Sequence, residues 1–243
     1  MSDDIIAAAS LIVLRERAGA APDILIVRRG AALTFAGGAY AFPGGRVDAG
    51  DRLLAARHLP DHDPDDSAAR IAAARETWEE TAVVVGRRAI GAGDMLPPGA
   101  AASGLPLDGA TLDHDAFVPF ARWLPPAGGK RRFDTRFYLA QAPVDAEPRA
   151  DGTETTEAFW ATAEEILARC RAGDGSALFP TRRLLERIAS LPTFAAARAH
   201  ALALPPLVIT PRVERRDGVD WLCIPDDAGY PVTAERLDNI RRA

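Results

Sequence analysis

Residues 42–51 read FPGGRVDAGD, a Phe-Pro-Gly-Gly turn that runs directly into acidic residues. Ordering such a turn is costly, because glycine loses the most backbone freedom on folding and proline lacks a hydrogen-bond donor. The turn ends an extended segment at residues 37–45, and two aspartates, Asp48 and Asp51, follow it. The sequence must therefore have a reason to place a rigid turn and two aspartates directly after an extended segment. A second stretch, RETWEE at residues 75–80, supplies it.

The stretch RETWEE lies in a segment that predicts a helix, with Asp63 or a nearby acid as its N-cap and Gly86 beyond its end. At about 100° per residue, one side of this helix is an apolar stripe made of Ile71, Ala74, Trp78 and Ala82. A neighbouring arc holds three glutamates and two alanines, namely Glu76, Glu79, Glu80, Ala69 and Ala72. We therefore expect the stripe to face a core and the carboxylates to share a low, uncrowded surface.

Three glutamates so close together on a helix repel one another unless a positive charge lies among them. Divalent cations that prefer hard oxygen ligands suit such an arrangement. The alternative is an ordinary solvated helix face, on which Arg75 pairs with Glu79 one turn later. The helix alone does not decide between these two interpretations.

Together, GGRVDAGD and RETWEETAV resemble the signature of the Nudix hydrolases. That signature runs Gly, five residues, Glu, seven residues, then Arg-Glu-U-x-Glu-Glu-x-Gly-U, where U is a bulky aliphatic residue. The positions that match are Gly45, Asp51 in place of Glu, Arg75, Glu76, Glu79, Glu80 and Val83. The chain departs from the signature at Thr77 and Ala82. Between Asp51 and Arg75 the chain has 23 residues, 52–74, where the signature has seven, so it carries an insertion of 16 residues.

The resemblance implies an α/β fold, a Nudix α/β/α sandwich around a mixed sheet. It also implies a metal site for Mg²⁺ or Mn²⁺, held by the backbone carbonyl of Gly45 and the carboxylates of Glu76, Glu79 and Glu80. Arg75 would orient a neighbouring carboxylate. Such cations polarise the oxygens of a diphosphate and lower the pKa of an attacking water.

The general base is left open by the resemblance, because some members use a helix glutamate and others a glutamate from a distant loop. Glu76 and Glu80 are the helix candidates. The polar stretch ADGTETTE at residues 150–157 offers Asp151, Glu154 and Glu157, of which Glu154 is the loop candidate. These loop acids could also simply solvate a turn.

Further stretches resemble one subgroup, the coenzyme A (CoA) diphosphatases of the peroxisomal and bacterial type. They are RWLPP…KRRFDTRFYLA, DGTETTEAFWATAEEIL, LFPTRRLLERIA and IPDDAGYP, so the resemblance covers nearly the whole chain. It implies cleavage of CoA or acyl-CoA to (acyl-)phosphopantetheine and adenosine 3′,5′-bisphosphate. The alternatives are hydrolysis of ADP-ribose or of a dinucleotide such as NADH, and a Nudix domain that senses nucleotides without hydrolysing them.

Basic side chains should then lie near the phosphates of the substrate, because arginine forks suit phosphate geometry. The candidates are Arg28, Arg29, Lys130, Arg131, Arg132 and Arg136. They could equally be a basic strand end that balances an acidic protein. Another CoA-associated pattern expects an arginine where this chain has Thr34.

Local patterns predict the remaining elements. Strands are expected at 5–16, 23–30, 116–126 and 131–143, a helix with a Thr162–Glu165 capping box at 156–173, helices at 179–191 and 193–204, and a hairpin around Asp217-Gly218. We expect residues 1–172 to form the hydrolase domain, with the insertion at 52–74 and a long surface loop at 91–116. Residues 173–243 should form a helical and hairpin extension packed on the same domain.

Composition narrows the class of protein. The chain has 243 residues, of which 48% are apolar and 26% charged, with a net charge of −5 that argues against a nucleic-acid-coating surface. Two cysteines, an acidic N-terminus and the absence of any long apolar run favour a soluble cytoplasmic protein without a membrane partner. The expected partner is a small-molecule nucleotide, and the C-terminal hairpin could close the fold or pair with a second copy in a homodimer.

Overall fold

The computed structural model describes residues 4–33, 36–89, 110–128 and 131–240. At the centre of these residues is an eight-stranded mixed sheet, in the order β10-β7-β8-β1-β2-β3, with β4 paired to β1 and β9 paired to β2. The pairs β1–β8 and β10–β7 are parallel, and the other pairs are antiparallel. The strand bounds are β1 (Asp4–Arg17), β2 (Ala20–Arg29), β3 (Tyr40–Ala41), β4 (Gly44–Arg46), β7 (Val118–Trp123), β8 (Arg131–Gln141), β9 (Thr155–Ala161) and β10 (Val208–Ile209).

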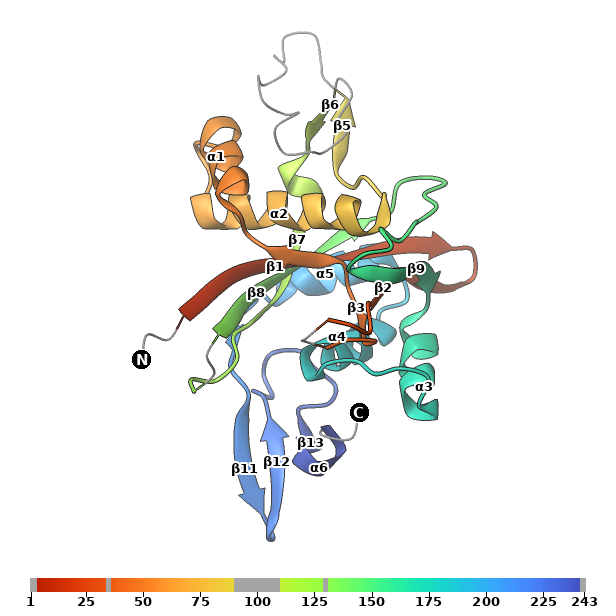
Figure 1. Cartoon of the computed structure of the whole chain (residues 1–243), viewed down its shortest axis with the longest axis vertical. Helices are drawn as coiled ribbons and strands as arrows, with labels where there is room; N and C mark the ends of the chain where they lie inside the picture. The colour runs from red at the N-terminus through yellow and green to blue at the C-terminus, as the bar shows by residue number, and fades with distance from the viewer. Residues whose placement is uncertain (1–3, 34–35, 90–109, 129–130, 241–243) are drawn as a thin grey trace.

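Helices cover both faces of this sheet, which gives three layers (Figure 1). Alternate residues of β1 point to opposite faces, as the two-residue period of a strand requires. Leu11 and Val13 pack against α2 (Pro64–Thr81), whereas Ile12 and Leu14 belong to the cluster that includes the helices on the other face. Those helices are α3 (Ala163–Ala172), α4 (Phe179–Ala189) and α5 (Phe194–Ala203). The α/β/α architecture expected from the sequence is confirmed.

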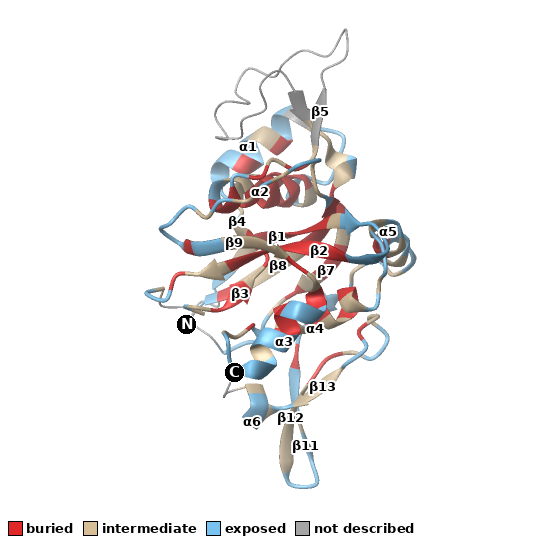
Figure 2. Cartoon of the chain, turned by 90° about the vertical axis from the view of Figure 1, so that its right-hand side faces the viewer, coloured by how far each residue is buried: buried red, intermediate tan, exposed pale blue. Residues whose placement is uncertain are grey.

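Helix α2 is more deeply embedded than its sequence pattern predicts (Figure 2). Ala69 and Ala72, expected on an open surface, are buried against the sheet. Ile71 is buried on the other side, against α1 (Ala49–His58). The expectation of an uncrowded alanine side was wrong, because the small side chains let the helix lie close to the sheet, and α1 covers the remaining side.

Two further elements differ from the expectation. Helix α1, at the start of the insertion at 52–74, is not signalled in the sequence. Residues 156–161, expected within a helix, belong to strand β9 on the edge of β2, and α3 begins only after its N-cap, Thr162. Residues 91–109 of the expected loop at 91–116 lie outside the described residues. The rest of that loop forms β6 (Ala110–Leu112), paired with β5 (Arg87–Ala89), and a short 3-10 helix.

The C-terminal part contributes to both the core and the periphery. Helices α4 and α5 share the main apolar cluster, and β10 joins the central sheet. Beyond them, a separate antiparallel sheet of β11 (Arg212–Arg216), β12 (Val219–Cys223) and β13 (Ala234–Arg236) projects from the body, followed by α6 (Leu237–Ile240) (Figure 1). The predicted hairpin at Asp217-Gly218 is confirmed. A domain boundary at residue 172 and pairing with a second copy stay predictions.

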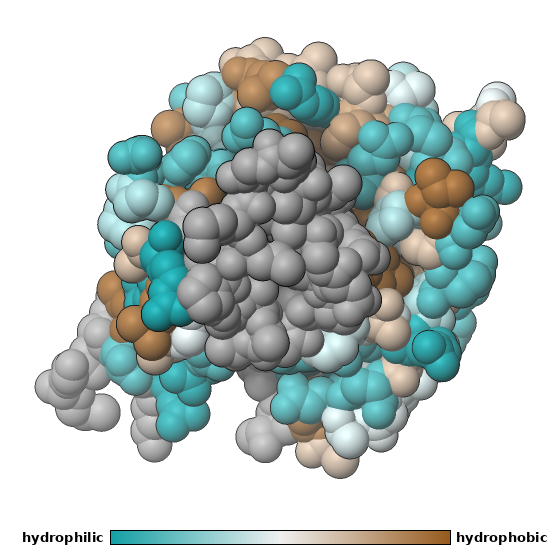
Figure 3. Space-filling model, turned by 90° about the horizontal axis from the view of Figure 1, so that it is seen from above, coloured by the Kyte–Doolittle hydropathy of each residue, from teal (hydrophilic) through white to brown (hydrophobic). Residues whose placement is uncertain are grey.

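The face above α1 and α2 is largely hydrophilic where described residues are visible, with apolar residues in small scattered groups (Figure 3). Leu53 on α1 is one of the exposed apolar residues of the chain. Single exposed apolar residues are ordinary on a protein surface. None of the helices in the described residues has the length and hydropathy needed to cross a bilayer.

Candidate active site

A cleft of about 720 Å³ lies where the Phe-Pro-Gly-Gly turn, the second half of α2 and the loop at 151–154 meet. About half of its lining is polar and consists of Ser10, Arg29, Arg46, Asp48, Arg75, Glu76, Glu79, Glu80, Thr135, Asp151, Thr153, Glu154 and Thr181. The other half comes from the turn, from β7 and β8, and from the start of α4. The structure therefore brings together the two stretches that the sequence singled out.

The glycines of the turn allow the backbone to approach the helix carboxylates. The N–H of Gly44 donates a hydrogen bond to Glu80 Oε2 at 3.1 Å. A Cβ at Gly44 would lie 2.3 Å from the carbonyl oxygen of Ala9, and a Cβ at Gly45 would lie 2.4 Å from the carboxyl carbon of Glu76. The backbone contact makes glycine a requirement of packing against β1 at position 44, whereas a side chain at position 45 would displace the carboxylate of Glu76.

Arg75 joins three carboxylates. Its Nε and Nη2 donate to the two oxygens of Asp51 at 3.0 and 2.9 Å, and its Nη1 donates to Glu76 and Glu79 at 2.9 Å each. Burial lowers the pKa of Arg75, but the bonds to Asp51 and the neighbouring charges outweigh burial and hold the pKa above its ordinary value. Arg75 is therefore a fixed cation that sets the positions of these side chains.

Asp51 lies in the first turn of helix α1, which fixes its position. It is 2% exposed, and besides Arg75 its carboxylate accepts the backbone N–H of Asp48 at 2.8 Å, in the capping box that starts α1. The chain thus uses the first turn of a helix to bury an acid beneath Arg75. Part of the 52–74 insertion is α1 itself, so the insertion helps to hold the site.

The glutamates of α2 have different surroundings. Glu80 is 7% exposed, and burial raises its pKa to about 8, with the charges of Glu76 and Glu154 adding to burial and the Gly44 N–H and Arg29 opposing it. Burial also raises the pKa of Glu76, although Arg75 counteracts it. The Glu79 side chain is 43% exposed. Crowded and partly desolvated carboxylates of this kind favour a bound cation.

The donor set fits a hard divalent cation chemically, since it is built from carboxylate oxygens and the carbonyl of a glycine that approaches them. Among the described residues, no three His, Cys, Asp or Glu side chains converge closely enough to hold a metal as they stand. Arg75 explains this spacing, because it binds one oxygen of Glu76 and one of Glu79. Each of these carboxylates keeps a second oxygen that Arg75 does not bind.

The raised pKa of Glu80 predicts how the metal-free protein responds to pH. The pKa is about 8 in the folded chain and near 4.5 when unfolded, so folding is favoured at low pH and this contribution is lost as pH rises towards 8. In EDTA, Glu80→Gln should become more stable than the wild type by up to roughly 5 kcal/mol between about pH 5 and pH 9. Urea unfolding across this range measures the difference. The prediction is contradicted if the difference in the free energy of unfolding between Glu80→Gln and the wild type does not grow with pH.

The loop at 151–154 presents Glu154 to the same cleft. The carboxylate of Asp151 accepts the backbone N–H groups of Thr153, Glu154 and Thr155, and Gly30 N–H donates to the Glu154 carbonyl at 2.8 Å. Burial tends to raise the pKa of Asp151, but the Thr153 hydroxyl and these N–H groups lower it overall. Asp151 therefore shapes the loop, and the Glu154 carboxylate makes no ion pair or hydrogen bond with other described residues.

Most of the basic residues that the sequence nominated do not line the cleft. Arg28 pairs with Glu157 at 3.1 Å, and Arg136 pairs with Asp66 at 3.3 Å. Arg132 donates to the carbonyl of Pro125, and Arg131 is exposed at the start of β8. Arg29 does line the cleft, and its buried Nε has no hydrogen-bond partner in the described part of the chain. Lys130 and Thr34 lie outside the described residues.

Sequence reasoning missed two features of the cleft. The first is Arg46, an exposed side chain that makes no ion pair with other described residues and directly follows Gly45, which could have signalled it. The second is the apolar half, formed by Phe42, Trp123, Pro125, Phe133, Phe137, Leu178 and Pro180. Its members come from distant parts of the chain, so no local pattern reveals it.

No family model matches the sequence, and no curated protein matches it. A solved structure of a Nudix hydrolase from Alicyclobacillus acidocaldarius is 30% identical, with a TM-score of 0.70, and the match covers 82% of this chain and 97% of that one. A MutT protein from Methanosarcina mazei Go1 is 18% identical, with a TM-score of 0.44 and coverage of 77% and 95%. A C. elegans Ap4A hydrolase is 16% identical, with a TM-score of 0.41 and coverage of 74% and 92%.

Proposed function

Since this chain belongs to the Nudix hydrolases, which hydrolyse the diphosphate bond of nucleoside diphosphate derivatives, we propose that it cleaves CoA or acyl-CoA. The products are (acyl-)phosphopantetheine and adenosine 3′,5′-bisphosphate. The observation that carries the proposal is the division of the lining between charged side chains from the turn, α2 and the loop at 151–154 and apolar side chains from β7, β8 and α4. A CoA ester has a diphosphate at its centre and a long, weakly polar arm on one side, which matches this division.

The metal ligands of the proposal are the carbonyl of Gly45 and the carboxylates of Glu76, Glu79 and Glu80, for Mg²⁺ or Mn²⁺. When bound, such ions polarise the diphosphate oxygens, offset the charge that develops in the transition state and activate the attacking water. Arg75 positions these carboxylates through its bonds to Glu76, Glu79 and Asp51. The buried Glu80, bonded to the Gly44 N–H, ties the helix to the turn.

Glu154 accepts the proton of the attacking water in this proposal. Two observations support this role. Glu154 lies in the same cleft as Glu80 and helps to raise the pKa of Glu80, and the turn at Asp151 fixes the backbone of Glu154. Glu76 and Glu80 remain alternative bases. Arg29 and Arg46 contact the phosphates, because both line the cleft and neither is neutralised by an ion pair with described residues. The ion pairs of Arg28 and Arg136 disfavour that role for them.

The apolar half receives the pantetheine arm and any acyl group. Phe42 and Phe137 pack edge to face at 6.4 Å and form its buried floor, and Phe133 and Leu178 complete its wall. One observation favours the alternative of ADP-ribose or a dinucleotide. Within the described residues, no basic side chain beyond Arg29, Arg46 and Arg75 lines the cleft to meet the additional 3′-phosphate of CoA.

A product assay by chromatography, first with Mg²⁺ and then with Mn²⁺, tests the proposal. The panel contains CoA, acetyl-CoA, a long-chain acyl-CoA, 3′-dephospho-CoA, ADP-ribose and NADH. We expect kcat/KM for the CoA compounds to exceed that for ADP-ribose and NADH by at least about 10-fold. Dephospho-CoA is the matched control for the 3′-phosphate, and Phe133→Ala should reduce kcat/KM for the long-chain ester more than for ADP-ribose. A preference for ADP-ribose or NADH would overturn the CoA assignment and leave the hydrolase unchanged.

A further inference from the structure

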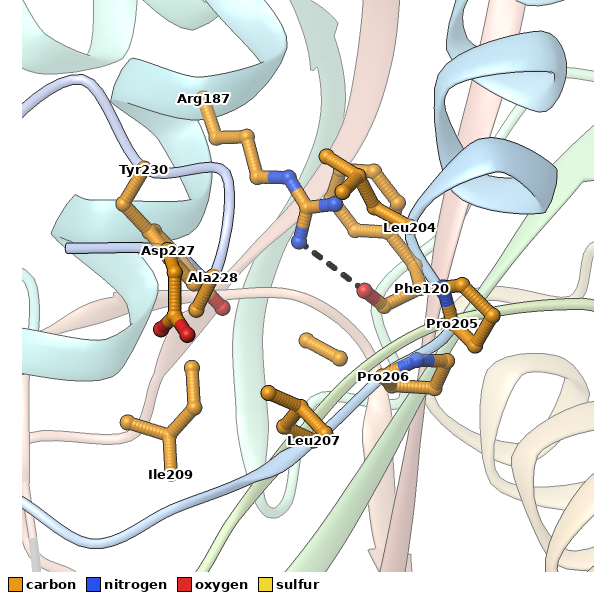
Figure 4. A pocket seen from close by; sticks show the side chains of 11 residues that line it. Phe120, Arg187, Leu204, Pro205, Pro206, Leu207, Ile209, Asp227, Ala228 and Tyr230 are labelled. Carbon is orange, nitrogen blue, oxygen red and sulfur yellow. Dashed lines mark hydrogen bonds between the residues drawn. The ribbon is translucent and has the colours of Figure 1, made fainter. Parts of the chain in front are cut away.

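A second cavity, of about 280 Å³, lies beneath the segment that connects α5 to β10 (Figure 4). Its walls are mainly apolar and include Phe120, Leu204, Pro206, Leu207, Ile209 and Tyr230. None of the carboxylates of the cleft lines it. The only charged side chains in its lining, which consists of described residues, are Arg187 from α4 and Asp227 from the turn after β12.

Arg187 is a buried cation without a carboxylate partner in the described part of the chain. It is 2% exposed, and its guanidinium lies between the rings of Phe120, at 4.0 Å, and Tyr230, at 5.1 Å. Nη1 donates to the Phe120 carbonyl and Nε to His200 Nε2, both at 3.0 Å, while the buried Nη2 has no hydrogen-bond partner among the residues that the structure describes. Figure 4 shows the guanidinium reaching from α4 to the wall of the cavity.

The same helix provides a comparison one turn earlier. Arg183 is also 2% exposed, but it pairs with Glu186 at 2.8 Å and with Glu235 at 3.1 Å. A buried charge is expensive unless it is paired, so this is the ordinary arrangement. Asp227 lines the second cavity without forming an ion pair with Arg187, and burial lowers the pKa of Arg187, although the neighbouring Tyr230 opposes this shift. The positive charge of Arg187 is thus not balanced by the described residues around it.

We propose that this cavity is a second ligand site, which takes a small organic monocarboxylate with an apolar body. The carboxylate of the ligand pairs with the guanidinium of Arg187, and its body contacts Leu204, Leu207 and Ile209. The apolar lining offers a phosphate too few donors, and the negative charge of Asp227 disfavours a dianion. The cavity is small, slightly below the usual range of drug-sized ligand pockets, so the ligand has few atoms.

One hydrogen bond links a residue that lines the cavity to a residue that lines the cleft. Trp123 Nε1 donates to the hydroxyl of Tyr230 at 2.9 Å, and the two rings pack edge to face. Trp123 lines the cleft and Tyr230 lines the cavity. The indole N–H of Trp123 is therefore a spectroscopic reporter of what happens beside Tyr230.

Titration calorimetry and thermal unfolding of the full chain with benzoate test the site. We expect saturable binding with a Kd of about 1 mM or tighter, a raised Tm, and a shift of the Trp123 indole signal in NMR spectra. Benzyl alcohol, which has the same ring without the charge, should bind at least about 10-fold more weakly. Absence of saturable benzoate binding up to about 20 mM, or equal binding of the two compounds, would overturn the proposal.

Variants separate the site from nonspecific binding. Arg187→Met should abolish benzoate binding, whereas Arg215→Met, which removes an exposed charge from the distant hairpin, should leave it unchanged. If Arg187→Met does not fold, Ala228→Leu gives the second test, because it fills the cavity and keeps the cation. Benzoate binding that survives in a folded Arg187→Met or Ala228→Leu protein contradicts the assignment.

Discussion

Glu80→Gln is expected to lower kcat for metal-dependent diphosphate hydrolysis by about 10³-fold or more. Glutamine has nearly the same shape, and its carbonyl oxygen can still accept the Gly44 N–H that Glu80 accepts at 3.1 Å. The substitution removes a carboxylate that is 7% exposed and lies beside Glu76, and that a bound cation would keep ionised. The fold should therefore persist while metal binding and turnover are lost.

Two measurements check this expectation. Initial rates at saturating Mg²⁺ or Mn²⁺ give the change in kcat, and calorimetry with Mn²⁺ alone gives the change in metal affinity without any reaction. Glu157→Gln is the matched control, since Glu157 pairs with Arg28 and does not line the cleft. Turnover of Glu80→Gln within a few fold of the wild type would show that this carboxylate is not part of the chemistry.

Arg75→Met is expected to lower the free energy of unfolding by about 3–5 kcal/mol. Arg75 makes two hydrogen bonds to Asp51 and one each to Glu76, Glu79 and the backbone carbonyl of Arg46. Methionine fills similar space but leaves Asp51, at 2% exposure, with its charge buried and unpaired. Removing one partner of a buried pair is far more damaging than losing an exposed one.

Urea unfolding at neutral pH measures this loss. Arg52→Met is the control, because Arg52 and Asp65 form an exposed pair at 2.6 Å, for which we expect a change below about 1 kcal/mol. Adding Asp51→Asn to Arg75→Met should restore part of the stability, since it removes the charge left behind. A loss in Arg75→Met no larger than in Arg52→Met would mean that Arg75 does not hold the site together.

The elements that the sequence predicted are those whose signals are local. β1 and β2 are apolar runs bounded by a turn, and the β11–β12 hairpin depends on Asp217-Gly218, whose positive φ angles of 48° and 80° suit that turn. Helix α1 and strand β9 depend on distant partners. Asp51 is fixed by Arg75, and residues 155–161 pair with the edge of β2, so neither could be inferred from nearby residues.

The candidate site divides in the same way. The resemblance to the Nudix signature links the turn to RETWEE across the insertion, so the geometry that joins Gly44 to Glu80 could be anticipated. The sequence could not show which of the candidate arginines are free to bind phosphate, because that depends on ion-pair partners far away in the chain. Arg136 is engaged by Asp66, 70 residues away, whereas Arg29 keeps an unbonded Nε.

The parallel pairing of β1 with β8 constrains the order in which the chain can fold during synthesis. Asp4 pairs with Arg131 and Leu14 with Gln141, so one edge of the first strand stays open until its partner has been made. The lining of the cleft is completed later still, because it includes Thr181 at the start of α4. A nascent chain therefore carries an unpaired strand edge through most of its translation, when aggregation is a hazard.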